Sequence, residues 1–495
     1  MKFIKTSLKI RQVLWLTLDF LKLSRLYKQF SRRKILNELQ VENFNLRRLV
    51  SQEFYLEYIS IFRQNIFHHE SRIWKFNSQK FHVDYAFIHN GLDKSDYTYR
   101  MIFMHCEWMF NNQSIDLDSF IKLHCELEKS DFFYHPSCTS QRAYVLIWTL
   151  VSKKTTNSFH NQLVLKYLKV LILNTEEYVY ANHLIDNYLA IIFLANFACL
   201  DSTVLWACRK LKNITLGWVE MGYYPEKTPC YQSLLAGRTM LVIKSLEVSD
   251  VFSKEINYLN RMHRTFLSCP DVHLNDSYLP IESWKKNSYF HCPYATSLNL
   301  EGGYQLVLVD DATPDRGYMG HAHDASGSFY IYDNSCRQLI GGRGTSSYRI
   351  SSDRDFTRSA KSYCSPRPKR AFVNRLNPWL SFRNTFSIKP IVNKYSLPNS
   401  RKKIVIIDKL NDGYSVNWFL PFDREGSVIA SCNRESELSF WSDFQSDELF
   451  KFIFISGDDL HLESFKGSRF NGIGNEIECY EYHLSFSSFI EFKLV

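Results

Sequence analysis

The stretch NHLIDNYLAIIFLANFACL, residues Asn182 to Leu200, decides the fold class of the first half of the chain. Its apolar residues recur at three- and four-residue spacing, which predicts an apolar helix that starts with NHLIDN. Two stretches just upstream, Arg142–Lys154 and Asn161–Tyr180, have the same period. Glycine and proline, which interrupt helices, are scarce in this half. We therefore predict helices up to about residue 265.

Beyond about residue 285 the pattern changes to short β-branched or aromatic runs divided by Gly, Asn, Asp and Ser, which predict strands. These runs are QLVLVDD, SFYIYDN, KKIVIID, VNWFLPF, KFIFISG and SFIEFKLV. A helical half followed by an all-β half predicts two segregated domains. We expect a basic helical extension in residues 1–75, a helical domain in 76–280 and a β domain in 281–495.

The composition limits the classes of partner. A formal net charge of +9 over 495 residues favours an anionic partner: nucleic acid, an anionic membrane surface or an anionic polysaccharide. No nucleic-acid-binding motif is recognisable, so we expect no nucleic-acid partner. The twelve cysteines form no CxxC pair, which argues against a zinc ribbon or a small disulfide framework and predicts free buried thiols.

The first 34 residues are basic and carry an apolar run at Val13–Leu18 that Asp19 and Lys22 interrupt. This pattern predicts an amphipathic basic helix rather than a cleavable signal peptide. No stretch of the sequence is long and apolar enough to predict a transmembrane segment.

GHAHDASGSF, residues Gly320 to Phe329, places His321 and His323 two residues apart, with Asp324 next. If this segment is a strand, both imidazoles point the same way, because side chains alternate along a strand. They could form a metal site, an acid/base pair or two polar groups on a wet face.

Three further stretches carry candidate functional residues. His183 and Asn187 are four residues apart on the predicted helix, so they share a face. The segment GYYPEKTPCYQ, Gly222 to Gln232, combines Glu and Tyr with two prolines. The basic run at Arg367–Arg383 interleaves Trp and Phe with Arg, which favours a sugar-binding edge over a solvated loop.

In this order the motifs resemble the heparinase II/III-like polysaccharide lyases. NHLIDNYLAI is similar to the family's NHLLxNxKAL, MGYYPEKTPCYQ to DGxxxExSPxYH, and GHAHDASGSF to GHAHADALSF. GTSSYRISSDRDFTRS and NPWLSFR resemble GTxxYxxxxxRxxxRST and VWxxFR. The resemblance runs from about residue 140 to 390. It implies an N-terminal (α/α) toroid of helical hairpins, then an antiparallel β-sandwich, with the active site in the cleft between them.

The resemblance also implies a reaction, the cleavage of an anionic, uronate-containing polysaccharide by β-elimination. A base removes the proton at C5 and an acid protonates the departing O4, while a donor offsets the charge of the neighbouring carboxylate. By resemblance, Asn182 neutralises that carboxylate, His183 and Tyr231 transfer protons, and His321 assists. The implied substrate-binding residues are Asn187, Glu226, Arg358, Trp379 and Arg383.

The metal site of the family is incomplete in this sequence. His323 matches one implied zinc ligand, but the other two positions fall on Gly342 and Tyr363. One ligand of three cannot hold zinc in its usual four-coordinate site. We therefore predict that the zinc site is lost and that no cofactor is needed, with Asp324 or Cys364 as possible substitutes.

Other departures leave alternatives open. Met221 replaces an Asp of the loop motif, and Gln232 replaces a His. The alternative to a lyase is a catalytically vestigial member that binds surface polysaccharide during its biosynthesis. A metallohydrolase built on the HxH pair is a third hypothesis, but a second ligand set is not visible. The resemblance implies the periplasm or cell envelope, whereas the missing cleavable leader and the scattered cysteines favour the cytoplasm.

Overall fold

The computed structural model describes residues 14, 17, 23–40, 65–88, 97–111, 117–153, 158–177, 182–246, 249–265 and 291–299, several of these with short gaps. Further along it describes residues 305–309, 328–332, 338–344 and the strands between 367 and 494. The chain divides into two compact units. Unit 1 comprises Met1–Gly222, Leu234–His263 and Arg316–Tyr318, and unit 2 comprises the rest of the chain. The predicted division at residues 75 and 280 stays a prediction.

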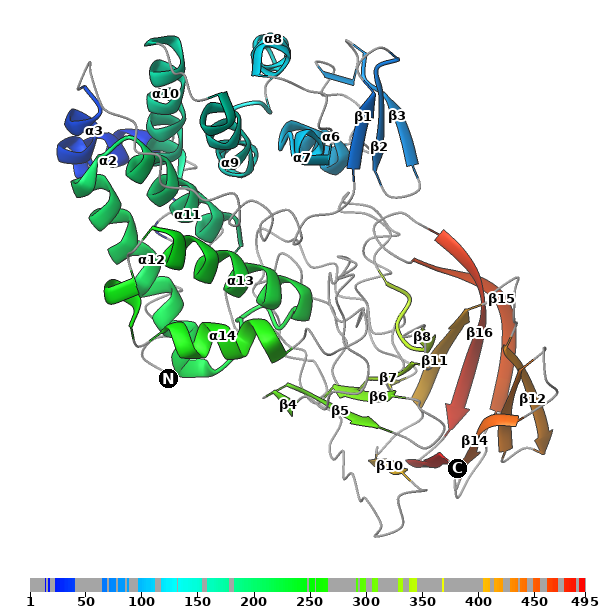
Figure 1. The fold of residues 1–495 in the computed structure, drawn as a ribbon. Coiled ribbons are helices and arrows are strands. Elements are labelled where there is room, and N and C mark those ends of the chain that lie inside the picture. The colour runs from blue at the N-terminus through cyan, green and yellow to red at the C-terminus, as the bar shows by residue number, and fades with distance from the viewer. Residues whose placement is uncertain are drawn as a thin grey trace. The chain divides into compact units, whose positions relative to one another are not determined.

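The described helices belong mainly to unit 1 (Figure 1). They are α2 (Ser24–Ser31), α3 (Arg33–Glu38), α6 (Tyr97–Met104), α7 (Trp108–Asn111), α8 (Leu117–Leu127), α9 (Pro136–Lys153), α10 (Ser158–Asn174), α11 (Asn182–Phe197), α12 (Asp201–Met221), α13 (Pro229–Ser245), the 3-10 helix η2 (Ser249–Phe252) and α14 (Ile256–Thr265).

Helix α11 lies among three other helices of unit 1. It packs against α9, α10 and α12, and fifteen of its sixteen residues are buried. A helix that is apolar on every side is stable only when neighbours cover it all round, which explains why this stretch is the most apolar of the described helices.

Unit 1 also holds a small antiparallel sheet, where the sequence predicted helices only. Its strands are β1 (Asn65–His68), β2 (Ile73–Phe76) and β3 (Gln79–His82). The fully buried Trp74 of β2 explains this sheet, because its ring lies 5.3 Å from those of both Phe81 and Phe103. The prediction of an all-helical first half was therefore wrong in residues 65–82.

The remaining strands belong to unit 2 and form three antiparallel sheets, ordered β4-β5-β6-β7-β8, β10-β17-β14-β13-β12 and β15-β16-β11-β9. Their bounds are β4 (His291–Cys292), β5 (Ala295–Asn299), β6 (Gln305–Val309), β7 (Phe329–Tyr332), β8 (Gln338–Ile340), β9 (Arg367–Pro368), β10 (Ile404–Lys409), β11 (Tyr414–Pro421), β12 (Val428–Arg434), β13 (Glu437–Ser442), β14 (Glu448–Phe454), β15 (His461–Phe470), β16 (Glu476–Phe486) and β17 (Phe489–Leu494).

Each of the six sequence runs predicted as strands overlaps one of these strands. The order of a mainly helical part followed by antiparallel strands is therefore confirmed, while the toroid and the sandwich stay predictions. No described helix has the length and apolar character needed to cross a membrane.

Five cysteines are described as free thiols, and Cys106, Cys138 and Cys208 among them are buried. Burial raises the pKa of each of these three thiols to about 12. They are therefore protonated at neutral pH and behave as small apolar side chains.

Candidate active site

Helix α11 offers one accessible side chain, and it is a histidine. Asn182 is the first residue of the helix and is 7% exposed, and Asn187 is fully buried. The side chain of His183 is 30% exposed, and every other residue of α11 is buried. A polar residue at the one open position of a buried helix is available for binding or proton transfer rather than for packing.

A buried carboxylate fixes the ring of His183. The Nδ1 atom of His183 lies 3.0 Å from Oε1 of Glu176, which is 2% exposed. Because an ionised carboxylate only accepts hydrogen bonds, Nδ1 carries the proton of this bond. In this tautomer Nε2 is the ring nitrogen that can accept a proton, as in a general base.

A chain of hydrogen bonds holds Glu176 in place. Its backbone N–H donates to Oδ1 of Asn187 at 2.9 Å. The amide of Asn187 in turn donates to Oγ of Ser140 at 2.9 Å, and the Ser140 hydroxyl donates to the carbonyl of Pro136 at 2.8 Å. Both the oxygen and the nitrogen of the Asn187 side-chain amide therefore have a partner within the protein. The contact of Asn187 with substrate stays a prediction.

A second histidine faces the same carboxylate. Nε2 of His135 lies 3.9 Å from Oε1 of Glu176, and the rings of His135 and His183 are 6.3 Å apart at 86°. Burial lowers the pKa of His135. Burial also acts to raise the pKa of Glu176, but the charges of both histidines and the hydrogen bond from His183 outweigh it, so this pKa lies below its usual value. Glu176 is therefore a carboxylate at neutral pH.

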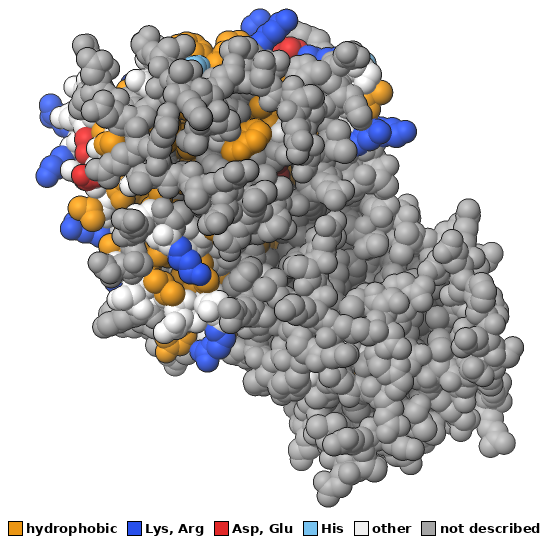
Figure 2. Space-filling model, in the orientation of Figure 1, with side chains coloured by type: hydrophobic (Ala, Val, Ile, Leu, Met, Phe, Trp, Pro, Cys, Tyr) orange, Lys and Arg blue, Asp and Glu red, His pale blue; other side chains and the backbone are white. Residues whose placement is uncertain are grey.

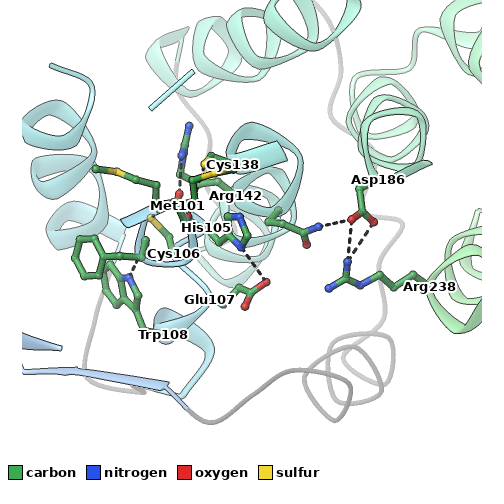
Figure 3. Close-up of polar contacts among 12 residues, drawn as sticks. Met101, His105, Cys106, Glu107, Trp108, Cys138, Arg142, Asp186 and Arg238 are labelled. Carbon is green, nitrogen blue, oxygen red and sulfur yellow. Dashed lines mark hydrogen bonds and ion pairs between the residues drawn. The ribbon is translucent and has the colours of Figure 1, made fainter. Parts of the chain in front are cut away.

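Asp186, further along α11, joins three helices together. Oδ2 of Asp186 accepts a hydrogen bond of 2.9 Å from Gln141 of α9. The Arg238 guanidinium of α13 donates to both Asp186 oxygens at 3.1 Å, and Figure 3 draws both contacts. Burial raises the pKa of Asp186, although Arg238 acts in the opposite direction. Figure 3 also shows a second pair, His105 and Glu107, in which Nδ1 of the histidine lies 3.7 Å from Oε1 of the glutamate.

The loop after α12 is built around a glycine and a buried glutamate. Gly222 ends the helix with φ +78°, a conformation that favours glycine. The Tyr224 hydroxyl donates to Oε2 of Glu226 at 2.8 Å, and its backbone N–H donates to the Gln232 side chain at 3.0 Å. Glu226 is fully buried, so it orders the loop in this conformation, and its predicted contact with substrate stays a prediction.

Tyr231 lies in the first turn of α13, after Pro229, whose fixed φ suits a helix start. Its side chain is 6% exposed. Tyr231 falls within unit 2, whereas Asn182 and His183 fall within unit 1.

Several predicted site residues lie outside the described residues: His321, His323, Asp324, Arg358, Tyr363, Cys364, Trp379 and Arg383. Of the predicted metal positions only Gly342 is described. It is buried and offers no side-chain ligand, so this position does not fit zinc. Within the described part of the chain, no group of three His, Cys, Asp or Glu side chains is arranged to hold a metal ion.

Sequence reasoning missed Glu176 and His135. Glu176 lies in the stretch Asn161–Tyr180 that was predicted to be helical, but α10 ends at Asn174 and leaves Glu176 in a loop. An acidic pair, Glu176 and Glu177, at the end of an apolar run was the available signal. His135 is too far from His183 along the chain for any local pattern to connect them.

The chain has the fold of solved polysaccharide lyases. A crystal structure of heparinase III matches with a TM-score of 0.59 and 11% identity, covering 94% of this chain and 89% of that one. The heparan sulfate lyase HepC from Pedobacter heparinus matches with a TM-score of 0.50 and 10% identity, covering 95% and 88%. Another heparinase III structure gives 0.51 and 11%, covering 96% and 91%. No protein-family model matches the chain, and neither does any curated protein. At these identities the likeness concerns the fold.

Proposed function

We propose, from the fold shared with heparinase III, that this protein is a polysaccharide lyase that cleaves an anionic, uronate-containing glycan by β-elimination. The observation that carries the proposal is His183, the one accessible residue of a buried helix, held by a buried carboxylate. In the proposed architecture the helices form the (α/α) toroid and the strands of unit 2 form the β-sandwich.

The chemistry needs a donor that offsets the charge of the substrate carboxylate, because a charged carboxylate acidifies its neighbouring proton poorly. We assign this part to the Asn182 amide, next to His183 at the start of α11. Preorganised donors of this kind stabilise the charge that develops in the transition state. Substitution of Asn182 by Asp would put a negative charge there and oppose the reaction.

His183 and Tyr231 are the proposed proton-transfer residues, and His321 the proposed helper. Glu176 supports His183 in two ways. It holds the Nδ1–H tautomer, and its negative charge, 3.0 Å away, stabilises the imidazolium that forms when Nε2 takes a proton. Glu176 is therefore a positioning residue, and Asn187 and Ser140 fix its loop in turn.

Absorbance of the unsaturated uronate bond tests the proposal. Purified protein is incubated with heparan sulfate, alginate and other uronate polymers, with and without a chelator, beside a Tyr231→Phe variant. We expect a rise with at least one polymer that the variant abolishes and the chelator leaves unchanged. No rise with any polymer would contradict a lyase.

One observation favours the alternative of a vestigial glycan-binding protein. Gln232, which replaces a His of the family's loop motif, accepts a hydrogen bond from the Tyr224 backbone. The position therefore serves the loop's own structure. In that case glycan binding would survive Tyr231→Phe, and no polymer would be cleaved. The cell envelope remains our proposed location, with the cytoplasm as the alternative.

A further inference from the structure

Helix α2 is attached to the protein by two charged side chains, that of Lys28 and that of Arg32, the residue directly after the helix. Lys28 and Arg32 are 4% and 5% exposed. The Lys28 ammonium donates to the carbonyl of Thr175 at 2.6 Å. The Arg32 guanidinium donates to Oγ1 of Thr175 and pairs with Glu177, both at 2.7 Å, and it lies 5.2 Å from the Trp206 ring. The side of the helix that carries Lys28 and leads to Arg32 is therefore the inner one.

The apolar side chains of the same segment point outwards. Leu23, Leu26, Tyr27 and Phe30 follow helical spacing and are 43%, 49%, 51% and 78% exposed. Residues at positions i, i+3, i+4 and i+7 lie on one face of a helix. A surface helix normally buries that face, so this arrangement is the reverse of the usual one and marks an interaction surface.

The charges around this apolar stripe identify the kind of partner. Arg25, Arg33 and Lys34 are exposed. The first 34 residues contain ten Lys and Arg and a single acidic residue, Asp19. Apolar and aromatic side chains flanked by cations suit the interface of an anionic lipid bilayer. A glycan offers nothing for leucines to bury against, and a second copy would bring the same positive charge to the contact.

We propose that the stripe Leu23–Leu26–Tyr27–Phe30 is a docking face for an anionic membrane surface, with the protein attached peripherally through α2. This inference is independent of the proposed lyase activity. Lys28 and Arg32, on the buried side of this segment, contact Thr175 and Glu177, the two residues that flank Glu176. A membrane docked on this face would therefore lie close to the loop that contains Glu176, the residue that orients His183.

Vesicle flotation of the full chain tests the proposal. The vesicles are phosphatidylcholine alone, or phosphatidylcholine mixed with phosphatidylglycerol. We expect binding to the anionic vesicles at least about tenfold tighter than to the neutral ones, weakened by salt. Leu26→Gln with Phe30→Gln should reduce it at least about tenfold, because lipid insertion depends on buried apolar area. Arg25→Gln with Arg33→Gln should remove the preference for anionic lipid.

Leu216→Gln is the matched control, since Leu216 is a 40% exposed leucine of α12, and it should bind vesicles like the wild type. Phe30→Gln alone serves if the double variant does not fold, which thermal unfolding reports. Absence of flotation, or full binding by the folded apolar variant, would overturn the proposal. So would a dimer in sedimentation velocity that these substitutions dissociate, or heparan sulfate binding that they abolish while vesicles are ignored.

Discussion

Replacing Glu176 by Gln removes one negative charge from the site and keeps the size of the side chain. The carboxylate is 2% exposed and lies 3.0 Å from Nδ1 of His183, so water cannot replace the lost interaction. A hydrogen bond to a charged group contributes about 1.5–3 kcal/mol, and each 1.4 kcal/mol or so of transition-state stabilisation is about tenfold in rate. We expect kcat to fall about 10- to 100-fold in Glu176→Gln.

KM should change little, because the interaction strengthens only when His183 takes up a proton in the transition state. The assay is initial rates by uronate absorbance, together with the free energy of unfolding in denaturant for each variant. Glu177→Gln is the control. Glu177 is the adjacent residue and is 1% exposed, but it bonds to Arg32 and Tyr188 instead of His183. Glu177→Gln should lower stability and leave kcat within a few-fold of the wild type.

Wild-type kcat in Glu176→Gln would refute this reasoning. Equal losses of kcat in the two variants would refute it too, because the effect would then follow from loop stability rather than from the charge beside His183. The pH dependence gives a separate check. The pKa of Glu176 lies below its usual value, so in the wild type this group stays ionised below the pH range in which carboxyl groups usually titrate. The fall of the rate on the acidic side of the pH profile should therefore not be due to protonation of Glu176 in that usual range.

Three further predictions concern buried ionisable groups. Burial lowers the pKa of His124 to about 3. As the pH drops, His124 therefore takes up a proton in the unfolded chain before it does so in the folded one. The free energy of unfolding should then fall by roughly 1.4 kcal/mol per pH unit below about pH 6.5. In His124→Gln, the free energy of unfolding measured in denaturant should fall less steeply as the pH drops. A fall as steep as in the wild type would contradict the lowered pKa of His124. Arg32→Ala leaves Glu177 buried without its cation and should lower the free energy of unfolding in urea by about 3–5 kcal/mol. A loss below about 1 kcal/mol would contradict a stabilising role for this ion pair. Arg238→Met removes the cation beside Asp186, whose pKa is already raised by burial, so its loss of stability should be larger at neutral than at acidic pH. An equal loss at both would count against that ion pair.

The sequence predicted those elements whose stability is encoded locally. The apolar period of residues 182–200 predicted α11, and β-branched runs predicted strands such as β6 and β10. In both cases the local sequence pattern alone indicates the type of secondary structure. The strands in residues 65–82 were missed because their hydrophobic support comes from Phe103, on a helix further along the chain.

The end of α10 shows why the site was predicted only in part. The apolar pattern continues to Tyr180, but the helix ends at Asn174. The carbonyls of Ile172 and Thr175 are taken by Arg32 and Lys28. These partners lie about 140 residues away in the chain, so no local pattern could reveal them or the loop position of Glu176. Motif resemblance led to Asn182 and His183, while the group that orients His183 required the tertiary structure.

The measurement that tests the central claim most directly is mass spectrometry of the oligosaccharides released from a uronate polymer, comparing wild type with His183→Ala. β-Elimination leaves a 4,5-unsaturated uronate at the new non-reducing end, so that fragment is lighter by one water molecule than the fragment that hydrolysis would leave. We predict the lighter fragment from the wild type and none from His183→Ala. Hydrated ends from the wild type, or unsaturated ends released equally by both proteins, would contradict a lyase that depends on His183.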